Sequence, residues 1–141
     1  MSRKLRVTRR GVTIKNMTIF KQKVGKHGED LAQKFLCQNG YKILEKNFRS
    51  SFGEIDIIAQ EKKTFCFVEV KTRHSQIFGS PSEAVSFQKQ EKIIKTALFY
   101  MNKKKLDNKD MRFDVVSIFL DGKEQILNIE IIKNAFEGAQ F

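Results

Sequence analysis

The chain has 141 residues, a length typical of one domain with a real buried core. It contains 40% hydrophobic residues, 13 Phe and no Trp, and its formal net charge is +11 at pH 7. No apolar run approaches the roughly 18 residues that a membrane span requires, and the N-terminus lacks the apolar core of a secretory signal. We therefore expect no transmembrane helix and a soluble, cytoplasmic protein.

The positive charge is concentrated at the N-terminus. Residues 1–28 contain nine Lys or Arg and no acid, whereas residues 29–141 carry 18 basic and 16 acidic side chains, a net +2. We therefore expect residues 1–22 to form a basic, flexible arm and residues 23–141 to form a single folded domain. Basic side chains that neutralise phosphates release condensed counterions, so such an arm suits a polyanion. The candidate phosphate contacts are Arg3, Arg6, Arg9 and Arg10.

Two other interpretations of the arm stay open. It can be a solvated extension that only aids solubility, or an organellar transit peptide, although Ser2 is its only serine. Met17 is an alternative start, which would make the preceding residues dispensable.

After the arm, the spacing of apolar residues predicts a helix over residues 28–39 that ends at Gly40. Glu29 falls on the core-facing side of this helix. An acid in a first turn is favoured by the helix dipole, so Glu29 is either a structural acid or part of a site. The apolar stripe consists of Leu31, Ala32, Phe35 and Leu36.

A strand over residues 41–50 comes next, with Tyr41, Ile43 and Phe48 facing inward. Residues 53–73 then read as a β-hairpin that turns at Lys62-Lys63. In an antiparallel hairpin, the residue numbers of every opposed pair have the same sum. Residues 56 and 69 have the same sum as the turn residues 62 and 63, so this turn places Asp56 opposite Glu69.

Opposed residues on paired strands share a face, as do residues two apart on one strand. Asp56, Glu69 and Lys71 should therefore converge on one face, with Glu54 opposite Lys71. The other face should carry the apolar residues Ile55, Ile57, Val68 and Val70.

Charged side chains among strand-core residues cost free energy unless they are paired or bind a metal. Hard cations such as Mg²⁺ often bind one or two carboxylates and keep water ligands, so Asp56 and Glu69 are candidate metal ligands. A neighbouring Lys71 can hold the attacking water in phosphoryl chemistry. The alternative is a charged strand end with ordinary cross-strand ion pairs.

A second helix is expected over residues 82–103, with Ser80 or Ser82 as its N-cap. Lys89 lies on the apolar stripe of this helix, where it either extends to water or faces a site. Strands are expected over residues 112–120 and 125–132. The stripe itself comprises Val85, Ile93, Ala97 and Tyr100 or Met101.

Two further charged residues are candidates for different roles. Arg73 falls on the Glu69 face, where contact with a phosphate is plausible. Asp114 is expected to have a structural role beside Arg112. The order of elements is helix, three strands, helix and two strands, which predicts an α/β fold with a mixed sheet.

The segments Gly53-Glu54-Ile55-Asp56 and Phe67-Val68-Glu69-Val70-Lys71-Thr72-Arg73 resemble the D…E-x-K signature of the PD-(D/E)XK nuclease superfamily. More closely, the chain resembles the YraN family, which is related to archaeal Holliday junction resolvases. Ile55 stands where the superfamily name has Pro, a change that the resolvase-like branch tolerates. The resemblance covers about residues 24–120 and includes Gly28-Glu29, Gly40-Tyr41, Asn47, Phe78-Gly79, Lys89 and Arg112-Phe113-Asp114.

This resemblance implies a restriction endonuclease-like fold, with a central mixed β-sheet and helices on its faces. It implies a metal-dependent endonuclease acting on DNA, including branched DNA, with Mg²⁺ or Mn²⁺ bound by Asp56, Glu69 and the Val70 carbonyl. Lys71 would position water, Glu29 would complete the acidic cluster, and Lys89 would contact a substrate phosphate.

Other functions stay open at this stage. The fold can serve as a non-catalytic nucleic-acid-binding module that acts with partners in DNA repair, recombination or uptake. RNA is an alternative ligand, because backbone charge does not distinguish RNA from DNA. Resolvase-like proteins often dimerise, so a homodimer is one expected assembly.

Overall fold

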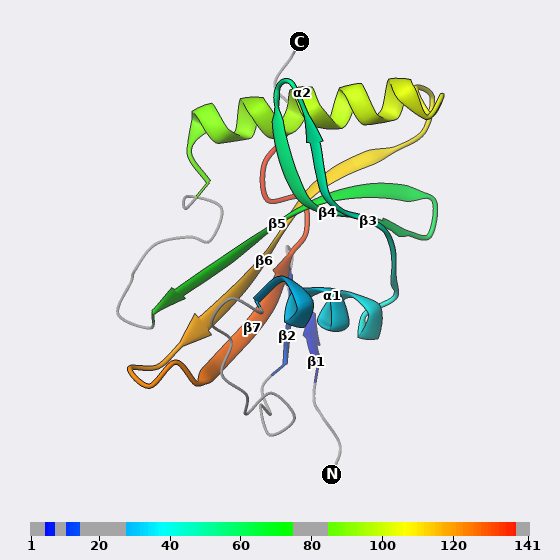
Figure 1. The fold of residues 1–141 in the computed structure, drawn as a ribbon. Helices are drawn as coiled ribbons and strands as arrows, with labels where there is room; N and C mark the ends of the chain where they lie inside the picture. The colour runs from blue at the N-terminus through cyan, green and yellow to red at the C-terminus, as the bar shows by residue number, and fades with distance from the viewer. Residues whose placement is uncertain (1–4, 8–10, 15–27, 75–84, 138–141) are drawn as a thin grey trace.

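A computed structural model of the 141-residue chain describes residues 5–7, 11–14, 28–74 and 85–137. Within these ranges the chain forms one seven-stranded sheet and two helices (Figure 1). The strands are β1 (Leu5–Val7), β2 (Gly11–Ile14), β3 (Tyr41–Ser50), β4 (Gly53–Glu61), β5 (Thr64–His74), β6 (Met111–Leu120) and β7 (Ile126–Ile132). The helices are α1 (Gly28–Gln38) and α2 (Phe87–Lys103).

The sheet has the strand order β1-β2-β7-β6-β5-β4-β3. β5 and β6 are parallel, and every other neighbouring pair is antiparallel. The parallel pair follows from the crossover through α2, since parallel neighbours need a long connection between them. The α/β class, the mixed sheet and the expected order of elements from α1 to β7 are confirmed.

β1 and β2 fall within the segment expected to be a flexible arm. They pair with each other, and β2 extends the sheet by pairing with β7. In the sequence, Leu5, Val7, Val12 and Ile14 supply the β-forming apolar residues of these two strands. Part of the basic segment is therefore an edge of the sheet and not a free extension.

The β4–β5 hairpin has the expected register. Ile57 pairs with Val68 and Glu61 with Thr64, so the turn is at Lys62-Lys63. Lys62 has a φ of 55°, the left-handed backbone that a tight hairpin turn demands. A one-residue slip would have moved the acidic residues to opposite faces.

Beyond the Ile57–Val68 pair, β4 bends, and one expectation about the hairpin is wrong. Asn47, which lies in β3 between the partners of Ile55 and Ile57, has a left-handed φ of 52°. At this kink Ile55 joins the apolar cluster under α2, while Ile57 joins the cluster under α1. These two residues therefore do not line one face, because the regular alternation of the strand is interrupted at Asp56.

The two helices cover opposite faces of the sheet (Figure 1). On one face Ala32, Phe35 and Leu36 of α1 pack on the sheet, as the helical stripe predicted. On the other face α2 packs through Ile93, Ile94, Ala97, Tyr100 and Met101. The N-terminal parts of both helices thereby lie near the bend of β4.

The second helix begins later than expected. α2 starts at Phe87, and its N-cap is Ser86, whose hydroxyl accepts a hydrogen bond from the Lys89 backbone N–H at 3.1 Å. Ser80 and Ser82, the expected caps, lie outside the described residues. Sequence patterns favour any serine before an apolar run, so neighbouring serines cannot be ranked. Within the described part of the chain, neither helix has the length and apolar content required to cross a membrane.

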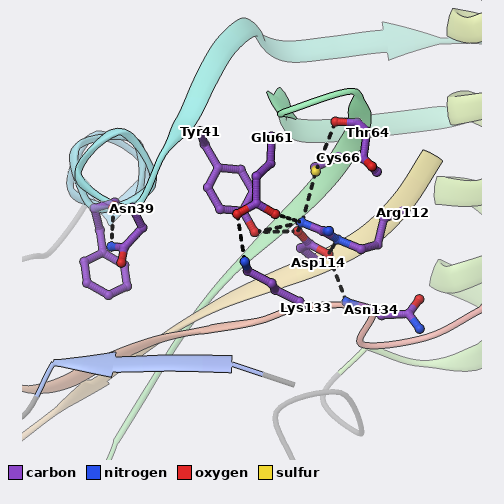
Figure 2. Close-up of polar contacts among 10 residues, drawn as sticks. Asn39, Tyr41, Glu61, Thr64, Cys66, Arg112, Asp114, Lys133 and Asn134 are labelled. Atoms are coloured by element: carbon purple, nitrogen blue, oxygen red, sulfur yellow. Dashed lines mark hydrogen bonds and ion pairs between the residues drawn. The ribbon is translucent and has the colours of Figure 1, made fainter. Parts of the chain in front are cut away.

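A buried polar network joins β3, β4, β5, β6 and the chain after β7 (Figure 2). The carboxylate of Asp114 is fully buried. It accepts hydrogen bonds from the Tyr41 hydroxyl at 2.8 Å, from Arg112 at 2.9 and 3.0 Å, and from the Asn134 N–H at 2.9 Å.

The network continues outward through a second carboxylate. Glu61 pairs with Arg112 at 2.9 Å and with Lys133 at 2.7 Å. Burial alone would raise the pKa of Glu61, but these two cations outweigh it and lower that pKa. The expected structural role of Asp114 beside Arg112 agrees with these contacts.

Replacing Asp114 with Ala should lower the free energy of unfolding by about 3–5 kcal/mol, because it removes the buried carboxylate that accepts hydrogen bonds from Arg112, Tyr41 and Asn134. The measurement is urea unfolding followed by circular dichroism. The matched control is Asp107→Ala at an exposed aspartate, with an expected change within about 0.5 kcal/mol. Equal losses in both variants would contradict this role.

Candidate active site

Asp56 lies at the bend of β4 and connects this strand to β5 through its side chain. Its Oδ2 accepts a hydrogen bond from the Val70 backbone N–H at 2.8 Å. The backbone pairing of the two strands ends at Ile57–Val68, and Val70 lies two residues further along β5. The carboxylate thus replaces the backbone as the link between the strands and is fixed close to Glu69.

Glu69 on β5 is almost completely buried, with 3% of its side chain exposed. Its Oε2 lies 2.5 Å from the Lys89 ammonium and 3.7 Å from the Lys71 ammonium. Both of its carboxylate oxygens are buried, and neither has a hydrogen bond of good geometry; the contact of Oε2 with Lys89 is an ion pair. A buried carboxylate oxygen without a donor is costly, and it leaves this site able to accept one more cationic or hydrogen-bonding group.

A second acidic group adjoins this pair. Glu29 in the first turn of α1 and Glu54 on β4 both have a carboxylate oxygen facing the side-chain amide of Asn47. Since only an N–H can satisfy two acceptors, the amide nitrogen faces them, at 2.9 Å from Glu29 and 3.3 Å from Glu54. Glu54 also pairs with Arg49 at 3.4 Å, across β3 and β4.

The charges of these groups are coupled. Burial raises the pKa of Asp56 to about 7. A hydrogen bond that protonated Asp56 can donate to Glu69, and the negative charges of Glu69 and Glu29, add to this effect, while the hydrogen bond from Val70 opposes it. Burial would lower the pKa of Lys89, but its contact with Glu69 and the negative charge nearby raise it instead. The cluster therefore favours bound cations and resists the ionisation of Asp56.

A cavity of about 320 Å³ opens beside these residues. One wall comes from β4 and the other from α2 and its N-cap, so it gives a ligand access to the Asp56 carboxylate. Its lining residues are Gly53, Glu54, Asp56, Ser86, Gln88, Lys89, Lys92 and Ile93.

The donor set is suited to a small, hard cation. Two close carboxylates, one of which has two buried oxygens without hydrogen-bond partners, match the oxygen ligands that Mg²⁺ and Mn²⁺ take. Among the residues that the structure describes, no three His, Cys, Asp or Glu are grouped closely enough to hold a metal by themselves. A metal here would therefore use Asp56 and Glu69 together with groups of other kinds.

Most of the residues singled out in the sequence meet at this site. Asp56, Glu69, Lys71 and Lys89 are connected by the contacts above, and Glu29 adjoins them through Asn47. Arg73 does not join them. Its side chain is buried, with the guanidinium carbon 5.8 Å from the centre of the Phe119 ring on β6, so it is not an exposed phosphate contact.

The arginines of the N-terminal segment are not placed at the site. Arg3, Arg9 and Arg10 lie outside the described residues. Arg6 lies in β1 opposite Thr13, at the far edge of the sheet from β4. Their role as phosphate contacts stays a prediction.

Two contributors were not assigned to the site from the sequence. Asn47 orders two carboxylates, and Lys92 lines the cavity. Lys92 lies three residues after Lys89, a spacing that places both on one side of a helix and could have identified it. The role of Asn47 depends on its left-handed backbone, which Asn tolerates better than most residues.

Comparison with known proteins confirms the resemblance to the YraN family. Residues 28–118 match the model of UPF0102, described as an uncharacterised protein family. This chain belongs to that family. A UPF0102 protein from Clostridium botulinum (strain Kyoto / Type A2) is 50% identical over 115 residues, which are 81% of this chain and 94% of the relative. A UPF0102 protein from Dictyoglomus turgidum is 49% identical, over 82% of this chain and 98% of the relative.

Among solved structures, the UPF0102 chain is similar to Pyrococcus furiosus SfsA, determined in complex with Ca²⁺. The TM-score is 0.35 and the sequence identity is 14%. The match covers 74% of this chain and 60% of SfsA. This likeness is too distant to assign a fold.

The raised pKa of Asp56 makes stability depend on pH. Between pH 3.8, the ordinary Asp value, and about 7, the folded protein keeps a proton that the unfolded chain has lost. Stability should therefore fall as pH rises through this range. Asp56→Asn keeps an acceptor for the Val70 N–H but carries no charge.

In buffer with a chelator, Asp56→Asn should unfold at a higher temperature than the wild type above pH 7, with little difference at pH 3.8 or below. The measurement is thermal unfolding at several pH values, with Asp107→Asn as a control that should follow the wild type. A difference that stays constant with pH would contradict the pKa shift.

Proposed function

We propose that this protein is a metal-dependent nuclease that hydrolyses phosphodiester bonds in DNA, on a restriction endonuclease-like fold. The observation that carries the proposal is the pair formed by Asp56 and Glu69. The half-buried carboxylate of Asp56 and the buried carboxylate of Glu69 are held together beside a cavity, and neither oxygen of Glu69 has a hydrogen-bond partner. Such a pair is unfavourable for stability alone, which favours a functional reason for it.

Asp56 and Glu69 would hold Mg²⁺ or Mn²⁺, which when bound polarises a phosphate and lowers the pKa of a water ligand. The hydrogen bond from Val70 fixes the Asp56 carboxylate, so its orientation needs no rearrangement when a ligand arrives. Glu29 adds negative charge on the α1 side of the pair.

Lys71 and Lys89 approach Glu69 from different elements and have different roles in this proposal. Lys71, on β5, would hold the attacking water through its ammonium N–H donors. Lys89, at the mouth of the cavity, would exchange its contact with Glu69 for a substrate phosphate. The basic residues before α1 would add phosphate contacts of lower specificity.

The second candidate is a nucleic-acid-binding module without hydrolysis. The contact between Lys89 and Glu69 favours it, because an ammonium already neutralises the carboxylate that a metal would need. In that case Asp56, Glu69, Lys71 and Lys89 would serve as an internal ion-pair network, and the basic residues before α1 would still bind the nucleic-acid backbone.

Asp56→Ala, Glu69→Ala and Lys71→Ala should each lower the cleavage rate by at least about 100-fold, because each removes a group that acts on the reacting atoms. The measurement is cleavage of linear, nicked, flapped and four-way-junction DNA with Mg²⁺ and with Mn²⁺. DNA affinity should change little, and Lys109→Ala should cleave normally. If the wild type cleaves no substrate of this panel with either ion, the binding-module interpretation replaces the nuclease.

Calorimetric titration with Mn²⁺ should show one site in the wild type that is lost in Asp56→Ala and in Glu69→Ala. Lys89→Met should bind the ion more tightly, since its ammonium no longer competes for Glu69. The Asp107→Ala variant serves as the carboxylate control. An unchanged titration in the Asp56→Ala/Glu69→Ala double variant would show that these two residues do not bind the metal ion.

A further inference from the structure

Two phenylalanine rings are exposed beside the cavity. Phe52, in the β3–β4 turn, is 46% exposed, and Phe99, on α2, is 41% exposed. Their ring centres are 6.5 Å apart, with the planes inclined at 63°. Single exposed apolar residues are ordinary, but two neighbouring exposed rings form a surface that needs a reason.

The rings are supported from below by an aromatic stack that reaches the core. Phe99 packs on Phe48 with centres 6.3 Å apart, and Phe48 packs edge-on against Tyr100 at 5.2 Å. Tyr100 in turn contacts the buried Phe67 at 5.8 Å. Phe99 is therefore held in a fixed position, so a ligand would pay little entropy to order it.

The turn that carries Phe52 is fixed against α2, as Figure 1 shows for the β3–β4 hairpin. The Ser50 hydroxyl accepts a hydrogen bond from the Phe52 N–H at 3.1 Å and donates one to the Thr96 hydroxyl at 3.3 Å. Gly53 lies so close to the helix that an added Cβ would be 3.3 Å from the Lys92 Cβ. This close approach keeps Phe52 beside Phe99.

The helix that carries Phe99 is basic. Residues 87–105 contain six Lys and one Glu. The Lys103 ammonium lies 5.9 Å from the centre of the Phe99 ring. Lys92 lines the cavity, and Gly53, the next residue after Phe52, lines it as well. The turn that carries Phe52 therefore reaches the cavity through Gly53, and Lys103 lies beside Phe99.

We propose that Phe52 and Phe99 form a stacking platform for the unpaired bases of a single-stranded nucleic acid whose phosphates contact the lysines of α2. Aromatic faces with interleaved cations bind single strands, because every base has a π-face that can stack. In a duplex the base faces are already stacked on one another and are not available. A second protein copy is disfavoured, because it would bring two lysine-rich surfaces together.

This inference extends the proposed nuclease by naming its substrate class: a strand unpaired at the platform, with its backbone continuing into the cavity. It rests on the proposed function only for the cleavage step, since single-strand binding does not require catalysis. Binding is therefore tested under conditions in which no metal-dependent cleavage can occur.

The experiment measures the fluorescence anisotropy of a labelled 20-nucleotide oligo(dT) and of a labelled 20-base-pair duplex, in EDTA. Phe52→Leu and Phe99→Leu in the full chain remove the ring but keep apolar volume. Each should weaken oligo(dT) binding by roughly 5- to 100-fold, the range for loss of one base–aromatic stack. Duplex affinity should stay within about twofold of the wild type. The control is Leu98→Ala, at a 45% exposed residue of the same helix, which should leave both affinities unchanged.

Lys103→Gln gives an independent measure of the phosphate contacts. It should lower the slope of log K against log salt on oligo(dT) by about 0.7, the value for one phosphate contact on a single strand. An unchanged slope would show that Lys103 does not contact a phosphate of the bound strand.

Three outcomes would overturn the proposal. Unchanged oligo(dT) affinity in both ring variants would do so, as would an equal loss on oligo(dT) and duplex. The third outcome is a wild type that dimerises in sedimentation, while Phe52→Leu is monomeric and binds oligo(dT) normally. The rings would then belong to a contact between two copies of the chain. Loss of oligo(dT) binding in the ring variants together with no cleavage by the wild type would retain the platform and reject the nuclease.

Discussion

The carboxylate of Asp56 connects two strands at the point where their backbone pairing ends. Because it accepts a hydrogen bond from the Val70 N–H, β4 can bend away from β5 while Asp56 stays close to Glu69. The bend opens the cavity, brings Ile55 under α2 and directs the β3–β4 turn along that helix. A regular ladder would leave a flat sheet with no recess beside the acidic pair.

The acidic pair is possible because α2 brings a compensating cation to it, while α1, on the opposite face of the sheet, adds a further acid. α2 supplies Lys89, and α1 supplies Glu29, which is held by the amide of Asn47. Without the Lys89 side chain, Glu69 would keep only the Lys71 ammonium, at the longer distance of 3.7 Å. The packing of α2 on the core is thus also an electrostatic requirement of the site.

The sequence predicted those parts that depend on local patterns. The even-length turn at Lys62-Lys63 set the register of the hairpin, and with it the meeting of Asp56 and Glu69. The kink at Asn47 was not predicted, because a left-handed residue inside a strand depends on the tertiary contacts that stabilise it. The burial of Arg73 was missed for a related reason: strand alternation gives a face, but not whether other elements cover that face.

The hairpin also has a consequence for the order of folding. β4 and β5 join through a two-residue turn, whereas β5 and β6 align in parallel only after the chain has crossed over through α2. Short loops close faster than long ones, so we expect the hairpin to form first. Asp56 and Glu69 then approach each other before Lys89 reaches them. The folding barrier of this chain should therefore contain a term of carboxylate repulsion that Lys89 has not yet offset, and that mild acid would relieve.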